Sequence, residues 1–195
     1  MKRLALAVAC LALAPHLQAQ LTKANVTAAQ LSAITGTARV TDLESSIWTS
    51  GKLRSRVYRG ESGTPAANLY VYEYSIDLRD VVGITSIPFL SSMSVDFGPI
   101  LGTLDFNADR KADQMFVVKG LGLGNVAPSS ATKSGNLITF VFDPPVGGGS
   151  APGNGDRTYV FGVLSKYPPR QVAATAQHNL GGAALSLKVQ APDWP

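Results

Sequence analysis

Apolar and polar residues alternate along several short stretches of this chain, and the clearest of these is "NLYVYEYSIDL" at residues 68–78. One face of this stretch carries Tyr70, Tyr72, Tyr74, Ile76 and Leu78. The other face carries Leu69, Val71, Glu73, Ser75 and Asp77. Because successive side chains of a strand point to opposite faces, this period of two predicts a β-strand. We expect its tyrosines to face the core rather than to form a platform for a sugar.

Three more stretches alternate in the same way, at residues 136–145 ("NLITFVFDPP"), 157–165 ("RTYVFGVLS") and 183–191 ("AALSLKVQA"). The segments "LRSRVYR", "MSVDFG" and "MFVVKGLGL" predict additional strands. We expect the strand at 136–145 to stop at Pro144 and Pro145, because proline cannot donate a hydrogen bond to a neighbouring strand. The residues between strands are rich in turn formers, with 19 Gly and 12 Pro in the chain.

This pattern predicts an all-β fold, namely an antiparallel β-sandwich or jelly roll of about 7–9 strands. We expect a single domain over residues 36–195, with a flexible loop at 143–157 ("DPPVGGGSAPGNGDR"). The preceding residues 20–35 form an N-terminal extension that is either frayed or a short helix. No repeat at a fixed period is visible, which argues against a propeller or a solenoid.

The first 19 residues, "MKRLALAVACLALAPHLQA", have the features of a secretory signal peptide. A basic start precedes an apolar run that is too short to span a membrane, and a small-residue cleavage site follows at Ala19. We therefore expect an exported protein that is periplasmic, on the cell surface or extracellular, with no integral membrane span in the mature chain. Cleavage would remove Cys10, the only cysteine, and it would remove Lys2 and Arg3 from a chain whose net charge is only +4. The charge balance gives no support for nucleic acid as a partner.

A concentration of oxygen-bearing side chains lies in "LDFNADRKADQMFVV" at residues 104–118. Asp105, Asn107, Asp109, Lys111 and Asp113 occupy relative positions 1, 3, 5, 7 and 9. Calcium prefers six to eight oxygen ligands, and alternating positions on a tight loop can converge on one ion, with the backbone carbonyl of Lys111 serving at position 7. The same residues are also typical of a polar turn in which Asp and Asn side chains accept hydrogen bonds from backbone amides. The sequence leaves both interpretations open.

This loop resembles the "DxNxDGxxD" calcium loops of FG-GAP repeats and dockerins, over about a dozen residues and in a single copy. The resemblance implies calcium as a stabilising ion bound by Asp105, Asn107, Asp109, Lys111 and Asp113. Arg110 replaces the expected glycine, so a non-glycine residue must adopt the sharp turn. Phe116 stands where an EF-hand has its glutamate, which argues against an EF-hand proper.

Basic residues gather in "SGKLRSRVYRG" at residues 50–60. At strand spacing, Arg54, Arg56 and Tyr58 share one face, and Lys52 and Arg59 lie nearby. Such a face could bind an anionic polysaccharide or lipid headgroups. The alternative is a solvated edge strand that its charges protect from aggregation.

The chain offers little for known catalytic chemistry. After cleavage of residues 1–19 only His178 remains as a histidine, which argues against a serine hydrolase or a catalytic zinc site. Carboxylates that could pair in a glycan hydrolase are numerous, but the sequence does not place them in space. They are Glu44, Glu61, Glu73, Asp77, Asp80 and Asp96.

The run from "NLYVYEYSI" through a Gly/Pro-rich middle to "YVFGVLSKYPP" resembles, in style, exported bacterial β-sandwich proteins of the PEP-CTERM type. The PEP motif, apolar span and basic end of their sorting tail are not found in this sequence. The resemblance implies a surface or extracellular matrix protein without enzymatic activity. We therefore expect an exported, non-catalytic β-sandwich with a structural or adhesive role, with polysaccharide or other surface proteins as partners. The alternatives are a carbohydrate-binding module and a carboxylate-dependent glycan hydrolase.

Overall fold

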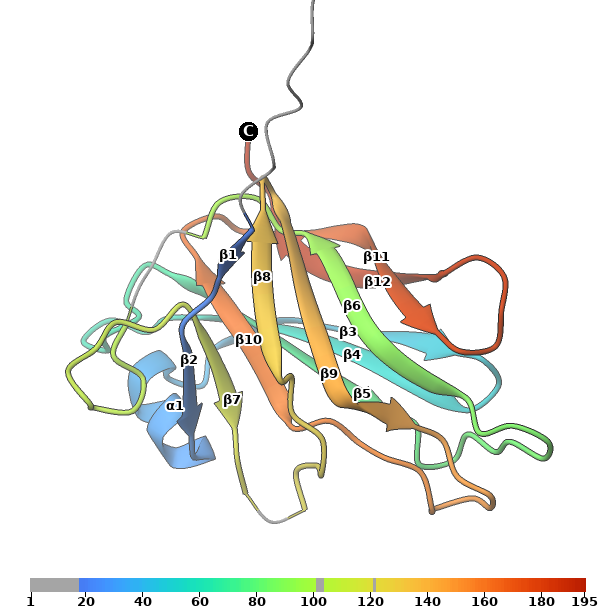
Figure 1. Ribbon diagram of the computed structural model, residues 1–195. Coiled ribbons are helices and arrows are strands. Elements are labelled where there is room, and N and C mark those ends of the chain that lie inside the picture. The colour runs from blue at the N-terminus through green and yellow to red at the C-terminus, as the bar shows by residue number, and fades with distance from the viewer. Residues whose placement is uncertain (1–17, 101–103, 121) are drawn as a thin grey trace, which may run out of the picture.

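The computed structural model describes residues 18–100, 104–120 and 122–195 (Figure 1). Residues 1–17 of the expected signal peptide lie outside this range. Within it the chain forms one helix, α1 (Ala28–Thr35), and otherwise strands. The strands of the first half are β1 (Ala19–Gln20), β2 (Lys23–Val26), β3 (Arg39–Ile47), β4 (Gly51–Arg59), β5 (Tyr70–Asp77) and β6 (Phe89–Asp96). Those of the second half are β7 (Met115–Val118), β8 (Ser130–Ser134), β9 (Leu137–Gly147), β10 (Val160–Ser165), β11 (Pro169–His178) and β12 (Leu185–Pro192).

These strands form two sheets of six strands each. The first sheet has the order β1-β8-β9-β6-β11-β12, and the second has the order β2-β7-β10-β5-β4-β3. Neighbouring strands pair antiparallel, except that β2 and β7 run parallel. Figure 1 shows β8, β9 and β6 of the first sheet in front of β10, β5 and β4 of the second. The expectation of an all-β fold is confirmed.

Both sheets contribute side chains to one large hydrophobic cluster, which we call the main core. Tyr72 and Tyr74 of β5 are buried in it, as the period of two predicts. The Tyr74 ring lies 6.1 Å from the ring of Phe140 on β9 and 6.0 Å from that of Phe161 on β10. The Tyr74 hydroxyl donates to the carbonyl oxygen of Gln190 at 2.7 Å, which links the second sheet to the first. A buried phenol needs such an acceptor, so these tyrosines are core residues with satisfied hydroxyl groups.

The second sheet also buries part of the face that it turns away from the main core, which we call the outer face. Helix α1 covers this face, and a smaller hydrophobic cluster lies between them. It includes Leu31 and Ile34 of α1, and Val71, Phe116 and Leu164 of the sheet. On the outer face of β5 only Val71 is buried, whereas Glu73, Ser75 and Asp77 are half-buried, so the strand departs from strict alternation at Val71.

Helix α1 begins and ends with recognisable capping residues. The Thr27 hydroxyl accepts a hydrogen bond from the backbone N–H of Gln30 at 3.2 Å, and the Gln30 side chain accepts one from the backbone N–H of Thr27 at 2.8 Å. This capping box satisfies amide groups that the first turn leaves free. Gly36 ends the helix at a φ of 73°. Part of the segment at 20–35 is therefore a short helix, one of the two alternatives that its sequence allowed.

One expectation and one alternative about strands are wrong. Strand β9 continues through Pro144 and Pro145 to Gly147. The prolines are tolerated because β8 pairs with β9 only as far as Val141, so beyond that point β9 has a neighbour on one side only. The loop expected at 143–157 consequently begins later, and its flexibility stays a prediction. Strand β4 is not an edge strand, because it pairs with β3 on one side and β5 on the other.

No helix in the described part of the chain is long and apolar enough to cross a membrane.

Gly162 at the centre of the second sheet is a position where a larger residue does not fit. It lies opposite Glu73 on β5 and Phe116 on β7. A Cβ atom at this position would lie 2.0 Å from the carbonyl oxygen of Tyr72 and 2.7 Å from Cζ of Phe116. We predict that Gly162→Ala lowers the free energy of unfolding by about 1–3 kcal/mol, because the sheet backbone must shift. Urea denaturation measures this loss.

Gly135 in the turn between β8 and β9 provides the control. It has a φ of 56° and no neighbouring atom within 4 Å of an added Cβ. Asparagine tolerates this conformation, so Gly135→Asn should leave the denaturation midpoint nearly unchanged. A Gly162→Ala variant as stable as the wild type would contradict the close packing of β10 against β5 and Phe116.

Candidate functional site

A row of oppositely charged residues crosses the outer face of the second sheet. The strand register places Asp42 on β3 opposite Arg56 on β4, and Arg56 opposite Glu73 on β5. Glu73 in turn lies opposite Gly162 on β10. Residues that are directly opposite on neighbouring strands point to the same face, so three charged side chains and a glycine follow one another beside α1.

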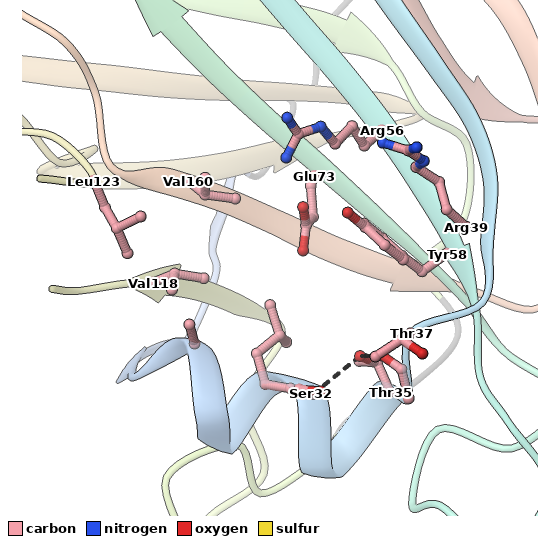
Figure 2. A pocket seen from close by; sticks show the side chains of 13 residues that line it. Ser32, Thr35, Thr37, Arg39, Arg56, Tyr58, Glu73, Val118, Leu123 and Val160 are labelled. Carbon is pink, nitrogen blue, oxygen red and sulfur yellow. Dashed lines mark hydrogen bonds between the residues drawn. The ribbon is translucent and has the colours of Figure 1, made fainter.

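A pocket of about 510 Å³ opens between this row and helix α1. Its apolar lining includes Leu31 of α1, Val118 of β7, Val160 of β10 and Leu123, which follows β7. Its volume lies within the range of about 300–1,000 Å³ that is typical of small-molecule sites. Figure 2 shows Val118, Leu123 and Val160 on one side of Glu73.

The polar lining of the pocket lies around Glu73. It includes Arg39, Arg56 and Tyr58, together with hydroxyl groups of Ser32, Thr35 and Thr37. Figure 2 shows the Glu73 side chain pointing from the sheet toward α1, with Tyr58 and Arg39 on the side away from Val118 and Val160. The pocket therefore has an apolar end and a charged end.

Glu73 has the most perturbed carboxyl group of this region. Burial raises its pKa to about 7 from the ordinary value of 4.5, with a smaller lowering by Arg56 and a smaller raising by Asp42. Within the described part of the chain, no hydrogen bond to this carboxyl group contributes to its pKa. Removal from water disfavours the charged form, so Glu73 exchanges a proton near neutral pH.

Three arginines compete for one carboxylate beside the pocket. Arg54 donates two hydrogen bonds to Asp42, at 2.8 and 2.6 Å, and Arg39 donates one at 3.0 Å. The hydrogen bond from Arg54 is the largest cause that lowers the pKa of Asp42. The Nε atom of Arg56 lies 3.4 Å from Asp42 Oδ2 but makes no hydrogen bond to it. Among the described residues this buried Nε–H has no acceptor at all.

The basic segment at 50–60 is thus divided among different roles. Arg56 and Tyr58 line the pocket, as their shared face allowed. Arg54 pairs with Asp42, whereas Lys52 forms an exposed ion pair with Glu44 at 3.1 Å. Sequence reasoning did not place Arg39 or α1 in a site, although the capping pattern Thr27-x-x-Gln30 was a readable signal for the helix.

Other carboxylates that the sequence offered for catalysis are engaged elsewhere. Glu61 accepts hydrogen bonds from the backbone N–H groups of Thr37 at 2.6 Å and Ala38 at 3.0 Å, which joins the end of α1 to the loop after β4. Asp77 pairs with Arg79 at 2.6 Å. Of the carboxylates proposed for pairing, only Glu73 is part of the pocket lining in the ranges that the structure covers.

The acidic loop at 104–113 is closed by its own hydrogen bonds. The Asp105 carboxylate accepts from the backbone N–H groups of Asp109 at 3.0 Å and Arg110 at 2.7 Å. The Asn107 side chain also accepts from the Asp109 N–H, at 3.1 Å, and Asp109 accepts from the Lys111 N–H at 2.8 Å. Arg110 has a φ of 67°, so this residue does adopt the sharp turn that the sequence required of it.

Asp113 closes the base of this loop. It is buried, and its carboxylate accepts from the backbone N–H of Phe106 at 3.2 Å. Burial raises the pKa of Asp113 above its usual value, and the charges of Asp109 and Asp105 raise it further. In the described ranges no three acidic or histidine side chains form a group that could hold a metal ion. A calcium ion would have to share these oxygens with the backbone amides, and calcium binding stays a prediction.

Comparisons with protein-family models, with curated proteins and with solved structures found no match for this chain.

The raised pKa of Glu73 predicts a pH dependence of stability that Glu73→Gln removes. Between pH 4.5 and about 7 the folded protein keeps a proton on Glu73 that the unfolded chain has released. Raising the pH through this window therefore favours unfolding, and the effect is complete above the folded pKa. The wild type should lose stability relative to Glu73→Gln across this window, as measured by urea denaturation at several pH values. A constant difference would show that the pKa of Glu73 is not raised.

Calcium binding by the acidic loop, if it occurs, predicts a shift in the midpoint of thermal unfolding. Millimolar calcium should raise the midpoint and a chelator should reverse the effect, because an ion that binds only the folded state stabilises it. Asp109→Asn keeps the acceptor for the Lys111 amide but removes a charge, so it should abolish the shift. Asp80→Asn, outside the loop, is the control. An unchanged midpoint in calcium would refute the metal site.

Proposed function

We propose that this chain is an exported, non-catalytic β-sandwich whose pocket between α1 and the outer face binds a small ligand. The observation that carries the proposal is a pocket of about 510 Å³ that brings apolar side chains together with Arg39, Arg56 and the carboxyl group of Glu73. The Nε–H of Arg56 is buried without an acceptor within the described residues, and Glu73 is a half-buried residue whose pKa burial raises to about 7. Buried polar groups in native proteins are nearly always hydrogen-bonded, so the guanidinium of Arg56 in this lining supports a polar ligand as its partner.

The sandwich arrangement is supported by the shared main core. Residues of β5 and β10 in the second sheet pack against residues of β9 in the first, as in the contact of 4.9 Å between the rings of Phe140 and Phe161. Export is proposed from residues 1–19 of the sequence, with the periplasm, the cell surface or the extracellular space as the destination. A structural or adhesive role at the surface is compatible with a ligand pocket. The pocket adds binding of a small ligand to this proposed role.

The two alternative functions receive less support from the pocket. A carbohydrate-binding module recognises sugars with aromatic platforms, whereas Tyr58 is the one aromatic residue in the described lining. A glycan hydrolase needs two carboxylates facing one another across the site, and the same lining contains only Glu73. A binding function requires neither of these features.

Blocking the pocket tests the proposed function. Ser32 is an exposed residue of α1 that lines the pocket, whereas its neighbour Ala33 is exposed and does not line it. Ser32→Trp should fill the pocket without changing either core, and Ala33→Trp is the matched control. We predict that a thermal-shift screen of anionic, cationic and neutral fragments finds ligands that stabilise the wild type and Ala33→Trp but not Ser32→Trp.

Two results would contradict the proposal. The first is a screen in which no fragment class stabilises the wild type. The second is a set of ligands that stabilise Ser32→Trp as well as the wild type, because such ligands bind elsewhere.

A further inference from the structure

The pocket of the proposed function also contains information about the chemistry of its ligand. We infer that it takes a monocarboxylate with an apolar body, whose carboxylate pairs with Arg56 and whose binding adds a proton to Glu73. This inference rests on the proposed function and goes further by naming the ligand class and the regulation of its affinity by pH.

The two ends of the pocket call for an amphiphilic ligand. Leu31, Val118 and Val160 offer apolar surface at one end, and Arg56 and Glu73 offer polar groups at the other. Burial of apolar ligand surface contributes roughly 25 cal/mol per Å², so the apolar end can supply affinity for a hydrocarbon body. A highly polar ligand would leave these side chains without a partner, whereas a pure hydrocarbon would leave Arg56 unsatisfied.

The charges favour an anion over a cation. Arg39 and Arg56 both line the pocket, and Glu73 is the only carboxylate in its described lining. Asp42 stands next to Arg56, but its oxygens already accept three hydrogen bonds from Arg54 and Arg39. The Arg56 guanidinium therefore remains available, and arginine binds carboxylates through two parallel hydrogen bonds. A cationic ligand would have to approach two arginines in order to reach Glu73.

Glu73 must be neutral when an anion occupies the pocket. Two carboxylates that share one site cannot both remain ionised, so the pKa of one rises. Burial already raises the pKa of Glu73 to about 7, so its protonation near neutral pH requires little free energy. The protonated group can then donate a hydrogen bond to the ligand carboxylate. The proton comes from solvent and remains on Glu73 while the ligand is bound.

The other charged groups around Glu73 do not prevent it from taking up a proton when the ligand binds. Arg54, Arg56 and Tyr58 face it from β4, and Arg39 and Asp42 face it from β3. The described lining from α1, β7 and β10 adds the hydroxyl groups of Ser32 and Thr35 and apolar side chains, with no ionisable group. The pKa of Asp42 is lowered by Arg54, so Asp42 stays ionised in the range in which Glu73 titrates.

Isothermal titration calorimetry with octanoate, 1-octanol and octylammonium tests the inference, because these probes share an apolar body and differ in charge. We expect octanoate to bind about tenfold or more tightly than the other two, as one charged hydrogen-bonded pair would provide. Octanoate affinity should fall from about pH 6 to about pH 8.5, a range in which a free carboxylic acid is ionised throughout. Near neutral pH, titrations in two buffers of different ionisation enthalpy should show proton uptake on binding to the wild type.

Three variants assign these effects to residues. Arg56→Gln should weaken octanoate binding by about tenfold or more, whereas Arg59→Gln should not, because Arg59 is exposed on the same strand and does not line the pocket. Glu73→Gln keeps a donor for the ligand but cannot take up a proton, so its octanoate affinity should be independent of pH. Proton uptake by the wild type requires no variant and tests the inference even where Arg56→Gln fails to fold.

The failure of this inference can be separated from the failure of the proposed function. Equal or tighter binding of 1-octanol or octylammonium, blocked by Ser32→Trp, would leave a ligand pocket but overturn the carboxylate. Octanoate binding without proton uptake would overturn the role of Glu73 and, with it, the inference. If none of the three probes binds while fragments blocked by Ser32→Trp do, the inference fails alone. If no fragment binds at all, both fail.

Discussion

The position of β5 between the main core and the smaller cluster under α1 is the constraint on which the rest of this structure depends. One face places Tyr72, Tyr74 and Ile76 in the main core, where the tyrosine hydroxyls find backbone acceptors in other segments. The opposite face lies beneath α1 and would be fully apolar in a simple two-layer packing of helix on sheet. Glu73 interrupts that face with a carboxyl group, and the pocket lies where it does so. A charged residue in this position is unfavourable unless it has a partner or a proton, and this requirement links the fold to binding.

The arginines near Glu73 differ in how many hydrogen bonds they make to Asp42. Asp42 accepts two hydrogen bonds from Arg54 and one from Arg39, and it lies 3.4 Å from the Nε atom of Arg56 without accepting a hydrogen bond from it. A local network that balanced every charge would leave no binding energy for a ligand. Here the guanidinium of Arg56 has no acceptor at its Nε–H within the described residues, and its strand β4 is held between β3 and β5. Such a position is better defined than one on a loop, since both neighbouring strands fix its backbone.

Much of the fold follows from alternation in the sequence, and the site does not. The strands around Tyr72, Phe140, Phe161 and Leu187 were readable because large apolar side chains recur at every second position. Strand β11 was not, because its buried residues are the small Ala174 and Ala176, which give little contrast with their neighbours. The prolines of β9 led to a wrong prediction of where this strand ends. A strand tolerates proline where no neighbouring strand needs its backbone N–H, and here β8 does not extend past Val141. This is a property of the sheet and cannot be read from the segment alone.

The pocket required information that no local pattern contains. The shared face of Arg54, Arg56 and Tyr58 was visible, but the pairing of Arg56 with Glu73 depends on a register between two strands. The raised pKa of Glu73 depends further on its burial in the folded chain, which no local pattern encodes. Arg110 stands where the calcium loops that this segment resembles have glycine, and the structure contains a left-handed residue at this position.

A crystal structure of the protein grown with octanoate tests the account most directly. We expect the ligand between α1 and the outer face, with its carboxylate within hydrogen-bond distance of Arg56 and Glu73 and its hydrocarbon chain against Val118 and Val160. A structure in which α1 packs against Glu73 with no space for a ligand, or in which octanoate binds only at another place, would contradict it.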